Sequence, residues 1–297
     1  MEWDLLEKTT FWVEDIDLQE ADLELVAAAA AQALGLEAHE VLVVDVRPGR
    51  VAFDILRRRV QAEAVAGKEK EILERLKEVP GVLLGPEAGV HSEGVLGLIA
   101  LEPAQAREIL STSARLAAEI SRAVARRALI FASGSEVLEG KIRDTNSPYL
   151  LEALTQAGFQ AEFGGILEDD IVAVVHRLEG AVERGYGLIV TTGGVGAEEK
   201  DCNVEAILRL DPQACTPWIL KFTPDNHRHH KEGVRIAVGR VGMARLVALP
   251  GPHEEVRLAC GALLEGLAQG LDDAGLAEKI AKVLRQRWQE RMGKGGS

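Results

Sequence analysis

Short apolar segments alternate with helical stretches from residue 128 onward, and this alternation constrains the fold more than any other feature of the chain. Alternation of this kind is typical of β-α-β units, in which a parallel sheet is covered by helices on both faces. We therefore predict a doubly wound, mostly parallel α/β domain. Its strands are expected at 128–133, 162–167, 187–191, 233–238 and 244–249, and its helices at 147–157, 170–183, 203–208 and in the closing segment to about residue 291.

The first hundred residues carry a different pattern. Strands are predicted at 9–13, 40–46, 50–56 and in the apolar segment 95–101, with an alanine-rich helix at 21–34 and a charged helix at 59–79. Pro48-Gly49 is a tight-turn signal between two apolar runs, so the two middle strands are expected to form a hairpin. The order β-α-β-β-α-β predicts a smaller, ferredoxin-like α+β module over residues 1–101.

A long helix is expected to connect the two parts. Glu102-Pro103 opens it, and apolar residues at helical spacing continue it to about residue 127. The predicted organisation is a module at 1–101, a connecting helix at 102–127, an α/β domain at 128–270, and a C-terminal helix and tail at 271–297, of which residues 293–297 are expected to be disordered.

Charge and composition exclude several classes of function. The chain has 297 residues, with 34 Lys and Arg against 47 Asp and Glu, which gives a net charge of -13. Such a balance disfavours nucleic acids as partners, because their capture needs clustered cations. No apolar run of signal-peptide or membrane-spanning type is present, so a soluble, cytoplasmic protein is expected. Three cysteines without CxxC spacing are expected to be free and partly buried.

The strongest local motif is an apolar strand that runs into a glycine-rich turn, Thr191-Thr192-Gly193-Gly194-Val195-Gly196. Glycines let the backbone approach a ligand closely, and N–H groups at the start of a following helix suit a phosphate. The motif is neither a Walker A loop nor a Rossmann fingerprint. A tight turn without a ligand, followed by helix capping at Asp201 or Asn203, is the alternative.

Two further polar loops follow predicted strands. Ser133-Gly134-Ser135-Glu136 and then Asp144-Thr145-Asn146 follow the first strand of the domain, and Glu168-Asp169-Asp170 follows the second. Helix capping alone would explain the aspartates. Because parallel strands bring these loops to one edge of the sheet, carboxylates and a phosphate-binding turn would share a crevice. Carboxylates beside phosphates imply a hard cation between them, so Mg²⁺ or another divalent metal is expected.

The order and spacing of these motifs, together with Leu249-Pro250-Gly251, are similar to those of a known family. Residues 128 to about 255 resemble the molybdopterin-binding domain of the MoaB and MogA proteins, of one MoeA domain and of the amino-terminal domain of CinA, with the first motif closest to CinA. The resemblance implies a molybdopterin or nucleotide ligand, a homo-oligomer (dimer or trimer), and Asp169 and Asp201 as catalytic residues that bind Mg²⁺ and orient a phosphate. The expected ligand-binding residues are Ser133, Gly134, Ser135, Glu136, Asn146, Thr192, Gly193, Gly194, Gly196, Asn203, Pro250 and Gly251.

This chain departs from the family pattern at several contacts. Ser135 stands where the family usually has an acidic residue, and Val195 stands where it usually has threonine. Cys202-Asn203 replaces the usual x-Thr, and Pro252-His253 replaces the usual x-Pro. These departures favour ligand binding over catalysis. Three functions stay open: a molybdopterin-binding-like protein in molybdenum cofactor biosynthesis, a CinA-like metal-dependent ADP-ribose pyrophosphatase, and a non-catalytic regulatory or scaffold protein. The amidase activity of full-length CinA proteins is not expected, because the chain has no room for that domain.

Two charged clusters match none of the family motifs. His227, His229 and His230 could ligate a transition metal, although a solvated loop explains them as well. Arg57-Arg58-Arg59 could hold an anion, although nearby glutamates favour a surface of mixed charge.

Overall fold

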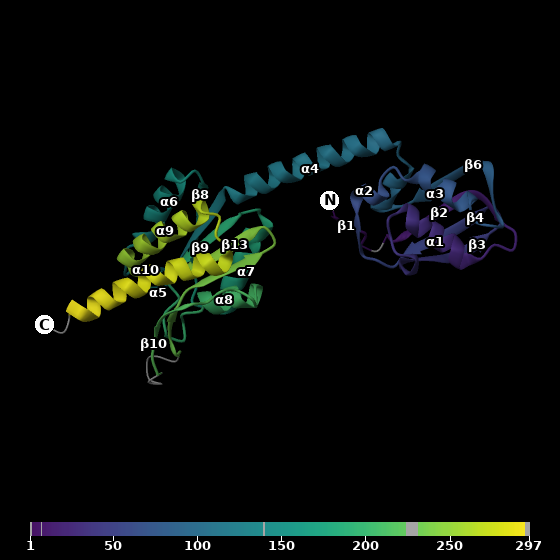
Figure 1. Cartoon of the computed structure of the whole chain (residues 1–297). Helices are drawn as coiled ribbons and strands as arrows, with labels where there is room; N and C mark the ends of the chain where they lie inside the picture. The colour runs from purple at the N-terminus through teal and green to yellow at the C-terminus, as the bar shows by residue number, and fades with distance from the viewer. Residues whose placement is uncertain (1, 7, 139, 224–230, 295–297) are drawn as a thin grey trace. The chain divides into compact units, whose positions relative to one another are not determined.

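The computed structural model describes residues 2–6, 8–138, 140–223 and 231–294 (Figure 1). The chain divides into two compact units, Met1–Ala118 and Glu119–Ser297, which are treated separately below. Helix α4 (Pro103–Ala125) contains the unit boundary and occupies most of the expected connector. The boundaries expected at 101, 127 and 270 stay predictions.

The first unit contains a four-stranded antiparallel sheet in the order β3-β4-β2-β6. Along the chain its strands and two longer helices follow the order β-α-β-β-α-β, which confirms the predicted α+β arrangement. The predicted hairpin joins β3 to β4, with Arg47 paired to Arg50 across Pro48-Gly49. The elements are β1 (Glu2–Asp4), β2 (Thr10–Leu18), α1 (Leu23–Ala33), η1 (Ala38–Glu40), β3 (Val41–Arg47), β4 (Arg50–Ile55), β5 (Arg59–Gln61), α2 (Ala62–Val65), α3 (Glu69–Lys77), β6 (Val82–Ser92) and η2 (Gly94–Ala100).

Two expectations for this unit were wrong. The last strand is β6, whereas the expected strand at 95–101 is the 3₁₀ helix η2, because its buried residues Leu96 and Ile99 are three apart and do not alternate. The expected helix at 59–79 is instead β5, α2 and α3. It breaks at Gly67, whose φ is 72° and where a Cβ would lie 3.1 Å from Pro103 Cα.

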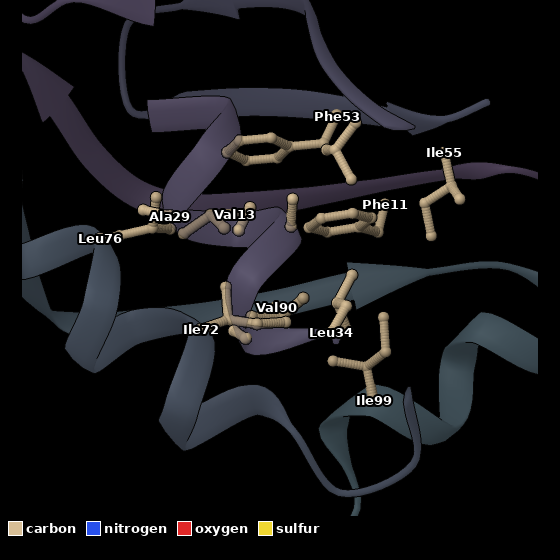
Figure 2. Packing of buried hydrophobic residues seen from close by; sticks show 14 of the residues in the cluster. Phe11, Val13, Ala29, Leu34, Phe53, Ile55, Ile72, Leu76, Val90 and Ile99 are labelled. Carbon is tan, nitrogen blue, oxygen red and sulfur yellow. The ribbon is translucent and has the colours of Figure 1, made fainter. Parts of the chain in front are cut away.

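The core of this unit lies between the sheet and helices α1 and α3. Phe11 of β2 and Phe53 of β4 stack with ring centroids 4.9 Å apart, and both are fully buried. Figure 2 shows them with Leu34, which directly follows α1, and with Ile72 and Leu76 of α3. Burial of this many apolar side chains is the main stabilising contribution to a unit of this size.

The second unit contains a five-stranded sheet in the order β12-β13-β9-β7-β8. All neighbours are parallel except β12 and β13, which confirms the predicted mostly parallel α/β fold. The expected strand at 233–238 is divided between β11 and β12, and the pairing of β10 with β11 was not predicted. The elements are β7 (Arg127–Ser133), α5 (Ser135–Leu138), α6 (Asn146–Gln156), β8 (Gln160–Leu167), α7 (Ile171–Glu183), β9 (Leu188–Thr192), α8 (Asn203–Leu210), β10 (Trp218–Lys221), β11 (Gly233–Arg235), β12 (Ala237–Val241), β13 (Ala244–Leu249), α9 (His253–Ala268) and α10 (Asp273–Lys294).

Helices cover both faces of this sheet (Figure 1). On one face, α6, α9 and α10 pack against Ile130 and Val190, and on the other, α7 and α8 pack against Leu129 and Ile189. The helices that follow the adjacent strands β7 and β9 therefore lie on opposite sides. Such a switch point leaves a crevice at the carboxyl ends of the two strands.

The C-terminal helix α10 extends to Lys294, so it enters the tail that was expected to be disordered, and residues 295–297 lie outside the described part. Among the described residues, no helix has both the length and the apolar character that a membrane span would require.

Candidate functional site

Four loops leave the same edge of the parallel sheet. They follow β7, β8, β9 and β13, whose last residues lie in adjacent register: Ser133 is paired with Leu167, and Thr192 with Ala132 and Leu249. The loops that the sequence singled out therefore begin in one row.

Asn203 joins two of these loops. Its side chain is 1% exposed, and its Nδ2 donates to Ser133 Oγ and to the carbonyl oxygen of Gly193, each at 2.8 Å. Its backbone N–H donates to Gly194 O at 3.0 Å. The N–H of Gly193 also donates to Leu249 O at 3.0 Å, so the loop after β9 is held between its two neighbours.

Three glycines allow this close packing. A Cβ at Gly193 would lie 2.7 Å from Ser133 O, one at Gly194 2.8 Å from Asn203 Nδ2, and one at Gly196 2.4 Å from Asp201 Oδ2. Gly193 and Gly194 have φ angles of 83° and 62°, in the left-handed region that favours glycine. The loop therefore needs glycine both for its backbone conformation and for space.

The same loop presents main-chain donors that other described residues leave unused. None of the N–H groups of Gly194, Val195, Gly196 and Ala197 donates to another residue of the described ranges. Val195 and Ala197 are buried, whereas Gly194 and Gly196 are half-buried. Unpaired N–H groups that are shielded from water are costly, and consecutive groups of this kind form concave binding sites for anions.

Asp201 lies at the end of this loop. Its Oδ2 accepts a hydrogen bond of 3.0 Å from the N–H of Glu198, and burial raises the pKa of the carboxyl group above its usual range. Among the described residues, Oδ1 of Asp201 has no hydrogen-bonding partner. Asp201 can therefore provide one oxygen ligand to a cation or accept one bond from a ligand.

Two lysines that the sequence analysis did not select also lie at this loop. Lys200 Nζ contacts Glu136 at 2.9 Å and Glu198 at 3.4 Å, and its hydrogen bond lowers the pKa of Glu136. Lys231 Nζ donates to the backbone carbonyl of Asp201. Both lysines add positive charge beside carboxylates, so the rim is less acidic than the motifs suggested. Lys231 lies 30 residues beyond Asp201, and no local pattern marks it.

Asn146 lies at the other side of the edge, where α6 begins. Its Nδ2 donates to Gly251 O at 2.7 Å, and its Oδ1 lies 2.9 Å from His253 Nδ1. The first bond fixes the orientation of the amide, so His253 Nδ1 carries the proton in the second bond. His253 was noted in the sequence only as a departure from the family pattern, and the structure places it beside a candidate ligand residue.

Capping explains two of the acidic residues. Asp144 Oδ1 accepts from the N–H groups of Asn146 and Ser147 at 2.9 and 3.0 Å, and Asp170 Oδ1 accepts from Ala173 N at 2.8 Å at the start of α7. Asp169 follows β8, which ends at the same edge of the sheet as β7 and β9.

Further candidate ligand-binding residues lie at the ends of strands or at the start of a helix. Thr192 is buried at the end of β9, Pro250 accepts a bond from Gly193 N at 3.2 Å, and Gly134 precedes α5, in which Ser135 is the first residue. His227, His229 and His230 lie outside the described residues.

The three arginines that match no motif of the family have structural roles. Arg57, Arg58 and Arg59 contact Glu40, Asp4 and Glu2 at 2.9, 3.0 and 3.7 Å, so they form ion pairs at a surface of mixed charge. All three cysteines are free, as expected, and burial raises the pKa of Cys260 to about 11.

The donor set gives limited support to a metal. Within the described ranges, no group of three or more His, Cys, Asp or Glu side chains could hold a metal ion. Mg²⁺ commonly uses only one or two protein carboxylates together with phosphate oxygens and water. Asp201, with one oxygen that no described residue engages, fits such a site only when a phosphate is bound.

The second unit is thus an α/β domain with a glycine-rich loop at the switch point of its sheet. Residues 129–269 match the family described as "Probable molybdopterin binding domain".

The chain is also similar to curated proteins and solved structures. A CinA-like protein of Thermosipho melanesiensis is 35% identical over 158 aligned positions, which cover 44% of this chain and 39% of that protein, so the chain spans about two fifths of its relative. The Mog protein of Mycobacterium ulcerans is 26% identical, with a TM-score of 0.41 and coverage of 50% and 99%. A CinA structure from Thermoplasma acidophilum is 20% identical, with a TM-score of 0.39 and coverage of 50% and 98%.

Proposed function

We propose that the second unit binds a phosphate-bearing pterin or nucleotide at the carboxyl edge of its sheet. The observation that carries this proposal is the row of N–H groups at 194–197, which other described residues leave unused beside a half-buried carboxylate. Phosphate oxygens are acceptors without donors of their own, so they match such a row.

The neighbouring side chains have separate roles in this proposal. Asn203 and Ser133 hold the loop in shape, and Lys200 offsets the negative charge of Glu136 at this edge. Asn146, held by Gly251 and His253, offers a polar edge for the rest of the ligand. Asp201, together with Asp169, would hold Mg²⁺ through phosphate oxygens, and the ion would supply charge neutralisation there.

The family description makes molybdopterin the first ligand to consider and a role in molybdenum cofactor biosynthesis the corresponding pathway. ADP-ribose pyrophosphatase activity is the alternative, and it would need the Asp169 and Asp201 carboxylates to hold a divalent metal.

Calorimetric titration of the full chain tests the proposal. The probes are molybdopterin, ATP and ADP-ribose, each with and without Mg²⁺, and adenosine is the matched control without phosphate. We expect heat and a thermal shift with the phosphate-bearing probes and neither with adenosine. If none of the phosphate-bearing probes binds, the proposal is wrong.

The same samples test the hydrolytic alternative. Chromatography after incubation of ADP-ribose with divalent metals would show AMP if the protein is a pyrophosphatase. Binding without AMP supports a binding or regulatory role. AMP that disappears in both Asp169→Asn and Asp201→Asn would instead establish the enzyme.

A further inference from the structure

Lys231 bonds to both ends of a short segment of the glycine-rich loop. Its backbone N–H donates to Ala197 O at 3.2 Å, and its Nζ donates to the carbonyl oxygen of Asp201. Lys231 lies just before β11, in a part of the chain that none of the motifs includes. One residue from outside the motifs therefore fixes the main chain at positions 197 and 201.

The first of these bonds also orients a donor to the Asp201 carboxylate. The carbonyl of Ala197 and the N–H of Glu198 belong to the same peptide group, and in a planar trans peptide they point in opposite directions. Because the carbonyl is turned toward Lys231, the N–H of Glu198 points away from Lys231 and donates to Asp201 Oδ2 at 3.0 Å. The carboxylate is thus held by a peptide group that Lys231 anchors from its other side.

The ammonium group of Lys231 is itself held in place. Its Nζ lies 3.0 Å from Glu205 of α8, and the Lys231 and Glu205 side chains are only 25% and 31% exposed. Ordering a long lysine side chain costs rotamer entropy, and this partly buried ion pair offsets that cost. The Nζ group therefore stays at the carbonyl of Asp201.

The charges around Lys231 are balanced. Glu205 also contacts Arg235 at 3.2 Å, so Lys231 and Arg235 share that carboxylate. Asp201 supplies a second negative charge: burial raises the pKa of its carboxyl group, and the charge of Lys231 opposes that shift. Two cations thus face two carboxylates, and the contacts of Lys231 with the loop account for its position without a ligand.

We propose that Lys231 is a positioning residue of the candidate site, which holds residues 197–201 so that the Asp201 carboxylate stays beside the N–H row at 194–197, and which does not touch the ligand. The inference rests on the proposed function, since Asp201 and the N–H row are the groups that would bind the phosphate and its Mg²⁺. It makes the affinity of the site depend on a residue that no motif contains.

A double-mutant cycle tests this role, with ATP and Mg²⁺ as the probe in calorimetric titration. Lys231→Met removes the bond to Asp201 O and should weaken binding by about tenfold, which corresponds to the loss of one hydrogen bond from a charged donor. In an Asp201→Asn background the same change should weaken binding by less than about twofold, because Lys231 acts through Asp201. Additive effects of the two substitutions would overturn the inference.

Two further variants show whether the effect is specific, and thermal unfolding shows whether each variant is folded. Lys231→Arg keeps a charged donor and should restore the affinity to within about twofold of the wild type. Lys221→Met is the matched control, because it removes a neighbouring lysine whose pair with Glu232 is more than half exposed, and it should leave the affinity unchanged. Equal losses in Lys221→Met and Lys231→Met would show that net charge decides the affinity, and the inference would be wrong.

Hydrogen exchange in the ligand-free protein separates this inference from the proposed function. The Glu198 amide, which donates to Asp201 Oδ2, should exchange about tenfold faster in Lys231→Met and at the wild-type rate in Lys221→Met. Unchanged exchange in Lys231→Met would mean that Lys231 does not hold the loop, and the inference would then fail even if the wild type binds ATP. If exchange is faster in Lys231→Met but the wild type does not bind ATP, Lys231 holds the loop and the proposed function is wrong.

Discussion

Nδ2 of Asn203 lies 2.8 Å from Oγ of Ser133, and this bond joins the loops that follow β7 and β9 across the switch point of the sheet. The same amide nitrogen also reaches Gly193 O, so one buried side chain fixes the distance between the two loops that border the crevice. The geometry of the candidate site depends on Asn203 more than on any acidic residue.

Replacement of Asn203 by alanine should therefore destabilise the second unit. The change removes two side-chain hydrogen bonds and leaves buried acceptors without a donor, which costs about 1–3 kcal/mol. Hydrogen exchange of the β7 and β9 amides measures the loss. Gln156→Ala is the matched control, because the Gln156 carboxamide makes an exposed bond to Glu152, and it should change stability by no more than about 0.5 kcal/mol. Equal effects of the two variants would contradict the role of Asn203.

The glycine-rich loop offers a second comparison. Gly194→Ala and Gly242→Ala both place an alanine at a left-handed φ, 62° and 56°, so the backbone conformation alone should cost each variant about 1–2 kcal/mol of stability. Only at Gly194 does the added Cβ meet another residue, Asn203, whereas a Cβ at Gly242 meets nothing within 4 Å. Calorimetry with ATP should show about tenfold weaker binding for Gly194→Ala and unchanged binding for Gly242→Ala. Unchanged affinity in both variants would exclude the loop from the binding site.

Asp201 should give a specific pH dependence. Burial raises the pKa of Asp201 in the folded protein above the usual 3.8, so the folded state holds this proton more tightly than the unfolded chain does. The contribution of Asp201 to the unfolding free energy therefore falls as pH rises from the unfolded pKa to the raised pKa, and it is constant above that. Asp201→Asn lacks this decline. Hydrogen exchange or urea unfolding across the acid range measures the difference in unfolding free energy between the wild type and the variant. If burial had no effect on the pKa of Asp201, this difference would not change with pH.

The first unit should depend on its stacked phenylalanines. Phe53→Ala removes a fully buried ring that stacks on Phe11, and a loss of about 3–5 kcal/mol is expected. Leu83→Ala in β6 is the control, because this side chain is 50% exposed. Exchange of the β2 and β4 amides should accelerate strongly only in Phe53→Ala. Similar acceleration in both variants would mean that the stack contributes little.

The periodicity of apolar residues predicted the regular helices and strands. It failed where a single residue or a contact distant in sequence determines the local structure. The alternation after residue 128 was sufficient for the parallel sheet, and Asp144 and Asp170 cap helices as their residue types suggest. Gly67 divides the expected helix at 59–79 because α4 packs against it, and no local pattern contains that contact. The motifs located the glycine-rich loop, but Lys231 reaches it from another part of the chain.

The bonds that shape the glycine-rich loop run between main-chain atoms and Asn203, and the side chains of Val195 and Ala197 take no part in them. Both side chains are buried, and Val195 packs in the core between the sheet and helices α7 and α8. The conformation of the loop is therefore set from two sides, through hydrogen bonds to Asn203 and through packing against the core. A loop that is anchored on both sides presents its N–H groups in one fixed arrangement.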